Sequence, residues 1–141
     1  MSLGLDTSVA LRLLIGAPAD QAEAARRLVA TAEEPVAISD LVVSELYFAL
    51  RHHYDVSHPD AVRAMDALLA DPRLRGSGVA PAVLRAAATR GAPKPRPGLI
   101  DSLIHANYAS DDLELVTFDR DLARLPGVRL LPSAALSPRN P

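Results

Sequence analysis

Short apolar segments alternate with longer amphipathic stretches along most of this sequence. Apolar residues recurring three and four positions apart predict helices, whereas short continuous apolar runs are typical of buried strands. Strands separated by helices pair in parallel, and the connecting helices cover both faces of the sheet. We therefore predict a single α/β domain over residues 1–141, with three α/β/α layers and a central, mostly parallel sheet.

The predicted elements follow from the periodicity and from the Pro and Gly residues that interrupt it. Strands are expected at residues 2–5, 36–38, weakly around 79, 113–117 and 129–131. Helices are expected at residues 8–15, 21–33, about 40–54, 59–70, 81–89 and 99–110. Residues 91–98 (GAPKPRPG) are too rich in Pro and Gly for a regular element and form a connection.

Composition sets broad limits on the class of protein. Of the 141 residues, 49% are hydrophobic and 23% charged, which indicates a folded domain. The absence of cysteine excludes disulfides and a thiolate zinc site. No segment resembles an export signal or approaches the roughly 20 apolar residues of a membrane span, so we expect a soluble cytoplasmic protein without membrane contact. The net charge of −2 neither favours nor excludes a nucleic-acid substrate.

Four carboxylates, Asp6, Glu45, Asp101 and Asp119, stand at the end of an apolar run or inside one. An ionised acid beside packed apolar residues is costly without a compensating positive charge, and no Lys or Arg accompanies these acids regularly. Ligands of open parallel sheets bind beyond the carboxyl ends of the strands. If the first and fourth strands are neighbours, the acids meet there, and a divalent metal held by oxygen is the natural counter-charge.

Each acid also has a simpler structural explanation. Asp6 could cap the helix that follows it, Asp101 could be favoured by the dipole of its own helix, and Asp119 could be a turn residue. Glu45 is the hardest to explain in this way, because its neighbours four positions away, Leu41 and Ala49, are both apolar. The occurrence of all four in this order favours a shared site.

Four motifs carry a resemblance to a known family: LDTSV around Asp6, SELYFAL around Glu45, IDSLIHA around Asp101 and VTFDRDLARLPGVRLL around Asp119. On these motifs the chain resembles PIN-domain ribonucleases, specifically the VapC-type toxins of VapBC toxin–antitoxin pairs. The resemblance extends over nearly the whole chain. The last motif is the most specific of the four.

The resemblance implies a metal-dependent endoribonuclease. Its acidic quartet corresponds to Asp6, Glu45, Asp101 and Asp119, of which Asp6, Asp101 and Asp119 would hold Mg²⁺, with Mn²⁺ as a substitute, and Glu45 would complete the site. Thr117 corresponds to a hydroxyl residue that orients ligands from the second shell, a role that Thr7 or Ser8 could share. Asp121 corresponds to a further acid, although capping the short helix around Leu122 explains it equally well. The resemblance also implies a cognate antitoxin and a homodimer, for which the helices at residues 22–30 and 41–50 offer apolar surface.

Other residues leave alternatives open. Lys94 and Arg96 could contact RNA phosphates, or they could form an ordinary solvated basic loop. His52, His53 and His58 could suggest catalysis without metal, but a helix end followed by an exposed loop explains them better. A receiver domain and a phosphatase with an Asp-x-Asp nucleophile are disfavoured, since Thr7 and Ser8 stand where further acids are needed. The alternative function is a non-catalytic PIN-like module that binds RNA or protein.

Overall fold

The computed structural model describes residues 2–132 and divides the chain into two compact units, residues 1–94 and residues 95–141. Each unit is described by itself. The predicted connection at residues 91–98 contains no helix or strand, and the boundary between the units falls within it. In the described residues, no helix is long and apolar enough to cross a membrane.

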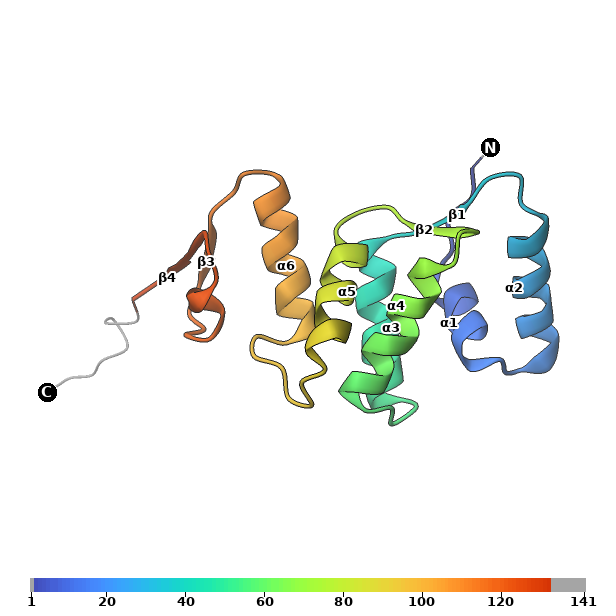
Figure 1. Cartoon of the computed structure of the whole chain (residues 1–141), viewed down its shortest axis with the longest axis horizontal. Coiled ribbons are helices and arrows are strands. Elements are labelled where there is room, and N and C mark those ends of the chain that lie inside the picture. The colour runs from blue at the N-terminus through green and yellow to red at the C-terminus, as the bar shows by residue number, and fades with distance from the viewer. Residues whose placement is uncertain (1, 133–141) are drawn as a thin grey trace, which may run out of the picture. The chain divides into compact units, whose positions relative to one another are not determined.

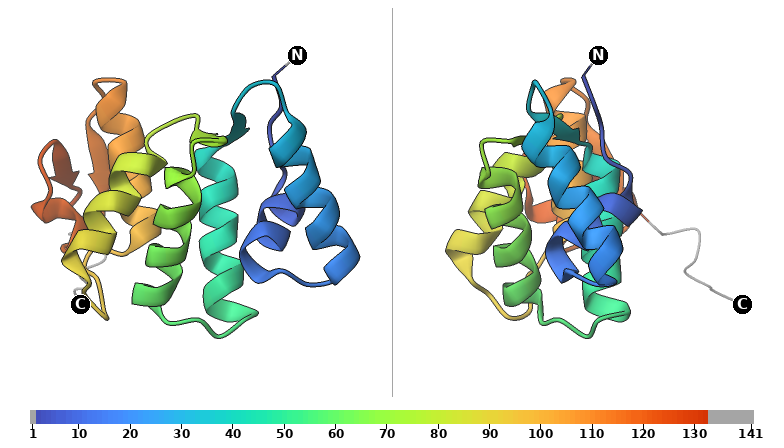
Figure 2. Two further views of the ribbon diagram at one scale, coloured as in Figure 1. Left: turned by 45° about the vertical axis from the view of Figure 1, so that its right-hand side comes forward. Right: turned by 90° about the vertical axis from the view of Figure 1, so that its right-hand side faces the viewer.

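Over residues 2–94, the first unit contains five helices and two strands. Figure 1 labels them along the chain. Their bounds are α1 Thr7–Ile15, α2 Ala19–Thr31, β1 Val36–Ile38, α3 Asp40–His52, α4 His58–Ala70, β2 Leu74–Gly76 and α5 Ala80–Arg90. Helix α4 packs against both α3 and α5, and α1 packs against both α2 and α3. Figure 2 shows α3 and α4 lying side by side.

Helix ends in this unit follow local sequence signals. Ser39 and Ser57 cap α3 and α4, each accepting a hydrogen bond from a backbone N–H three residues later at 3.2 Å. Helices α1 and α5 end at Gly16 and Gly91, whose positive φ angles suit residues without a Cβ. The five helices predicted in this unit are therefore confirmed with small shifts at their ends, and the sixth, at residues 99–110, is confirmed in the second unit.

Strands β1 and β2 pair in parallel, with Val36 opposite Leu74. The segment before Asp6 joins this pair through an isolated parallel bridge between Gly4 and Ala37. The strand expected around Val79 is wrong, because Val79 precedes α5 as its N-cap and the strand lies earlier, at β2. A three-residue strand with one buried apolar side chain, Leu74, gives too weak a pattern to be found in the sequence.

The core of the first unit is aliphatic, and both strands and each of the helices α1 to α5 contribute buried side chains to it. Its largest fully buried side chains are Ile38, Leu46, Met65, Leu84, Val36, Val43 and Val62. Leu46 and Val43 lie on the apolar stripe that the spacing in α3 predicts. Burial of such side chains is worth about 1.5–3 kcal/mol each, so this core fixes the helices that carry the candidate residues.

Asp40 joins two helix starts in the first unit. Its carboxylate accepts hydrogen bonds from the backbone N–H groups of Val79 at 3.0 Å and Ala80 at 2.9 Å, where α5 begins. These donors have no partner within their own helix, and a carboxylate at a helix N-terminus is favourable. A Cβ placed on Gly78 would lie 2.3 Å from the same carboxylate, so glycine is needed there for the close approach.

The second unit contains α6 Leu99–Ser110, β3 Leu115–Thr117, a short 3₁₀ turn at Leu122–Arg124 called η1, and β4 Val128–Leu130. Strands β3 and β4 pair in parallel, with Leu115 opposite Val128, so the last two predicted strands are confirmed with shorter bounds. Each unit thus holds one two-stranded parallel pair. The predicted mixed α/β class with parallel strands is confirmed.

Candidate active site

Asp6 stands directly after the bridged segment that precedes α1. It occupies the N-cap position of α1, yet its side chain makes no capping hydrogen bond. Instead, Oδ2 of Asp6 accepts a hydrogen bond from Oγ of Ser8 at 3.2 Å, and the side chain is exposed. Capping therefore does not explain this acid, and Ser8 takes the orienting position that the sequence suggested for it or for Thr7.

Thr7 has a different environment from Ser8. Its Oγ1 is buried and, within the described residues, has no hydrogen-bond partner. Buried polar atoms are nearly always paired, so an atom of this kind next to Asp6 is where a bound water would be expected.

Glu45 lies in the middle of α3, but not on its buried stripe. The side chain is exposed, between Leu41 and Phe48, whose exposed fractions are 78% and 52%. The argument that its charge is costly because it is packed among apolar groups is therefore wrong for this residue. Within its own unit, no described residue offers Glu45 a hydrogen bond or an ion pair.

Asp101 is the third residue of α6 and lies in its first turn, as predicted. Its side chain is half-buried, and within the second unit no described residue forms an ion pair with it. The helix dipole favours an acid at this position. This structural explanation and a ligand role are compatible, because the dipole acts without occupying either carboxylate oxygen.

Asp119 follows β3 and organises the turn after it. Its Oδ1 accepts hydrogen bonds from the backbone N–H groups of Asp121 at 2.8 Å and Leu122 at 3.3 Å, at the start of η1. Thr117 contributes by accepting from the backbone N–H of Asp119 at 2.9 Å. Thr117 thus orders the backbone at Asp119. The turn explanation for Asp119 holds, and it leaves Oδ2 for another ligand.

Asp121 does not cap η1 with its side chain, so that explanation is wrong. Its carboxylate lies 3.7 Å from Arg96 and 3.8 Å from Arg124, as two partly exposed ion pairs. Exposed pairs of this length are worth little, and both Arg96 and Lys94 remain accessible to solvent. The structure brings Arg96, Asp119 and Asp121 into one region of the second unit.

His52 and His53 follow the structural explanation, a helix end and an exposed loop. His52 and His53 are exposed at the end of α3, where both contact the Phe48 ring. His58 differs from the expected loop residue, because it is buried at the start of α4, with Nδ1 at 2.7 Å from the Tyr47 hydroxyl. Burial, and then the charges of Arg51 and Arg90, lower the pKa of His58 below 6.5, which favours the neutral ring.

The predicted ligands are distributed between the units: Asp6 and Glu45 belong to the first, and Asp101 and Asp119 to the second. Over residues 2–132, no three Asp, Glu or His side chains are grouped so as to hold a metal ion. The donor chemistry nevertheless suits Mg²⁺ or Mn²⁺, which prefer carboxylate oxygens and retain several waters. Among residues 2–132, no ion pair within its own unit neutralises any of the four carboxylates.

Comparison with protein-family models matches residues 4–128 to the PIN domain. The chain belongs to the PIN domain family. The match includes all four acids, and it extends over most of both units. In the same comparisons, neither a curated protein nor a solved structure matched the chain.

Membership confirms the predicted fold class and the coarse function. PIN domains are typically metal-dependent nucleases, and their metals are divalent ions. In this PIN domain, as the sequence predicts, Asp6 and Asp101 lie at the starts of helices and Asp119 lies just after a strand. The sequence did not indicate that Asp40, next to the cap of α3, reaches the start of α5, since the contact joins residues about 40 positions apart.

Proposed function

We propose that this PIN domain is a metal-dependent endoribonuclease toxin of the VapC type, acting in the cytoplasm. The observation that carries the proposal is the position of Asp6 and Asp119, each of which follows the carboxyl end of a parallel β segment. In each, the hydrogen bonds to the side chain that the described residues make use one carboxylate oxygen. Ligands of parallel sheets bind at that end. The acids of this family are suited to a site for metal-dependent hydrolysis of phosphodiester bonds.

The proposed site combines the four acids that the sequence predicts: Asp6, Glu45, Asp101 and Asp119. Asp6, Asp101 and Asp119 would hold the metal, which when bound supplies an activated water and charge stabilisation at the scissile phosphate. Ser8 fixes the Asp6 carboxylate through Oδ2, and the η1 backbone fixes Asp119 through Oδ1. Glu45 would orient a water. Hydrogen-bonded carboxylates of this kind lose little conformational freedom on binding a metal.

RNA phosphates would be met by Lys94 and Arg96. Both side chains are exposed, and the ion pair that Arg96 makes with a described residue is the 3.7 Å contact to Asp121. Phosphate contacts of this kind position a substrate without reading its sequence. Their replacement would therefore weaken binding of all RNA sequences to a similar extent.

The proposed partners are a cognate antitoxin and a second copy of the chain. On α3, Leu41, Glu45 and Phe48 are spaced at i, i+4 and i+7, so two large exposed apolar side chains flank a proposed catalytic acid. A partner segment that covers this face would bury the side chains of Leu41 and Phe48 and would at the same time block access of substrate to Glu45. Phe48→Ser should then weaken antitoxin inhibition without reducing cleavage by the free toxin.

Cleavage of single-stranded RNA tests the proposed activity directly. We expect cleavage with Mg²⁺ or Mn²⁺, none after chelation, and a loss of roughly 100-fold or more in Asp6→Asn and Asp101→Asn. Asp111→Asn, an exposed acid at the end of α6, is the matched control and should cleave normally. Equal behaviour of wild type and both quartet variants would instead indicate a non-catalytic PIN-like binding module.

A further inference from the structure

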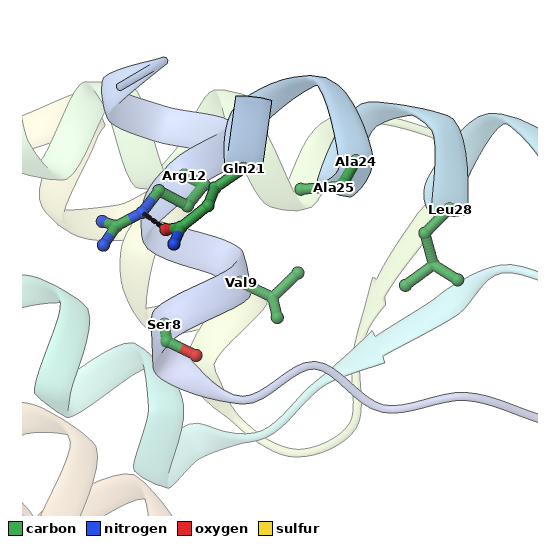
Figure 3. A pocket seen from close by; sticks show the side chains of 7 residues that line it. All are labelled: Ser8, Val9, Arg12, Gln21, Ala24, Ala25 and Leu28. Atoms are coloured by element: carbon green, nitrogen blue, oxygen red, sulfur yellow. Dashed lines mark hydrogen bonds between the residues drawn. The ribbon is translucent and has the colours of Figure 1, made fainter. Parts of the chain in front are cut away.

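A pocket of about 580 Å³ lies between α1 and α2 in the first unit. Figure 3 shows Arg12 and Gln21 at one end of it, Leu28 at the other and Val9 between them. Ala24 also lines the pocket, so most of its surface is apolar. An apolar hollow with a few polar groups at one end is typical of sites for small planar ligands.

The polar end of the pocket is organised by one hydrogen bond. Nε of Arg12 donates to Oε1 of Gln21 at 2.7 Å, which leaves the Gln21 amide nitrogen and the remaining Arg12 nitrogens as donors. Among the described residues, Arg12 forms no ion pair. The pocket therefore presents a fixed group of hydrogen-bond donors with a positive charge.

The pocket also adjoins Asp6, one of the proposed catalytic acids. Ser8 lines it, and the same Ser8 hydroxyl donates to Oδ2 of Asp6 at 3.2 Å. One side chain thus separates the pocket from Asp6. A ligand bound here would lie beside the RNA bond that the proposed site cleaves.

We propose that this pocket binds a guanine base of the RNA substrate, next to the cleaved bond; the inference rests on the proposed nuclease function. The faces of the base would contact Val9 and Leu28. Guanine carries two adjacent acceptors, O6 and N7, which match the donors of Arg12 and Gln21. Adenine carries a donor at the corresponding position, where the Gln21 oxygen is already engaged by Arg12.

An apolar side chain from a protein partner is the competing occupant. It would use the lining at Val9, Ala24 and Leu28 but would leave the Arg12 and Gln21 donors without partners. Buried donors without partners are costly, and this disfavours such an occupant. The base uses both parts of the pocket, as RNA-binding proteins do when they hold a base turned out of its strand.

Binding of the four nucleoside 5′-monophosphates tests the inference. Because their phosphate is common, any difference in affinity comes from the base. Calorimetric titration of the full chain with chelator present should show GMP binding at least about tenfold more tightly than AMP, CMP or UMP. Arg12→Ala should remove this preference, and Ala24→Leu should weaken GMP binding by filling the pocket. Arg27→Ala is the matched control, since Arg27 lies on α2 outside the pocket and pairs with Glu23 at 3.3 Å.

The outcomes separate this inference from the nuclease proposal. Selective GMP binding that Arg12→Ala abolishes would support the pocket even if RNA is never cleaved. Equal affinities for the four nucleotides, or equal effects of Arg12→Ala and Arg27→Ala, would overturn the inference even in an active nuclease. An Ala24→Leu variant that binds GMP normally but loses a protein partner would also overturn it, and would assign the pocket to that partner.

Discussion

Oδ1 of Asp119 accepts a hydrogen bond from the backbone N–H of Asp121 at 2.8 Å, so a proposed metal ligand also supports the turn in which it lies. The second contact, from the Leu122 N–H, uses the same oxygen. The structural and chemical roles of Asp119 are therefore divided between its two oxygens. Substitutions that remove one or both oxygens can separate these roles.

Asp119→Asn and Asp119→Ala should differ in stability but not in activity. Asn retains an oxygen for the η1 N–H groups, whereas Ala removes it and should lower the free energy of unfolding by about 1 kcal/mol. Both changes remove the negative charge and should abolish cleavage. Urea denaturation beside an RNA cleavage assay measures the two effects. An active Asp119→Asn would exclude this carboxylate from the metal site.

Asp40 and Gly78 should be among the most sensitive positions for stability outside the hydrophobic core. Asp40→Ala leaves two N–H groups at the start of α5 without their charged acceptor and should cost about 2–4 kcal/mol in urea denaturation. Asp40→Asn should not restore stability, since its amide nitrogen would face an N–H. Glu33→Ala, an exposed acid, is the control and should change stability by less than about 0.5 kcal/mol.

Gly78→Ala tests the same contact from the other side. The added Cβ would lie 2.3 Å from Oδ2 of Asp40, so one group must move and the variant should be destabilised by about 1–3 kcal/mol. Gly98→Ala is a suitable control, because φ there is −69° and a Cβ would meet nothing within 4 Å. Comparable stability of the two variants would show that the Asp40 contact is easily rearranged.

His58 should make stability fall in mild acid. Because the pKa of His58 is lowered in the folded chain, the unfolded chain takes up a proton first as the pH falls through about 6.5. The free energy of unfolding should therefore decrease as the pH falls below 6.5, and His58 contributes at most about 1.4 kcal/mol per pH unit to this decrease. Well above pH 6.5, the titration of His58 should not change the free energy of unfolding.

Denaturation curves between pH 5 and 8 measure this dependence. His58→Gln should flatten the curve near pH 6, while His53→Gln, at an exposed position, should leave it unchanged. A His58→Gln variant with the wild-type pH dependence would assign the acid sensitivity to other groups.

Periodicity and helix signals in the sequence predicted the helices well, because signals such as Gly16 and Gly91 act within one turn of the helix ends that they mark. The strands were harder to predict. Strand β2 is three residues long and ends at Gly76, and its formation depends on pairing with β1, which lies far away in sequence. Local patterns carry little information about such pairing.

The positions of the acids were also predictable, but their environments were not. Glu45 was expected among packed apolar groups and is exposed, because Leu41 and Phe48 lie on the same outer face of α3. Asp119, and not Asp121, accepts the backbone N–H groups at the start of η1, and this depends on the geometry of one turn. The Arg12–Gln21 contact joins two helices and leaves no local signal.

The central proposal is that Asp6 and Asp119 are ligands of one metal. Its most direct test is Mn²⁺ binding, measured by calorimetry, to wild type, Asp6→Asn, Asp119→Asn and the double variant. A shared site predicts that each single change lowers the Mn²⁺ affinity at least tenfold. The loss of affinity in the double variant should then be much smaller than the product of the two single losses. Asp111→Asn should bind as wild type. Wild-type Mn²⁺ affinity in either single variant, or independent effects that multiply in the double variant, would contradict a shared site.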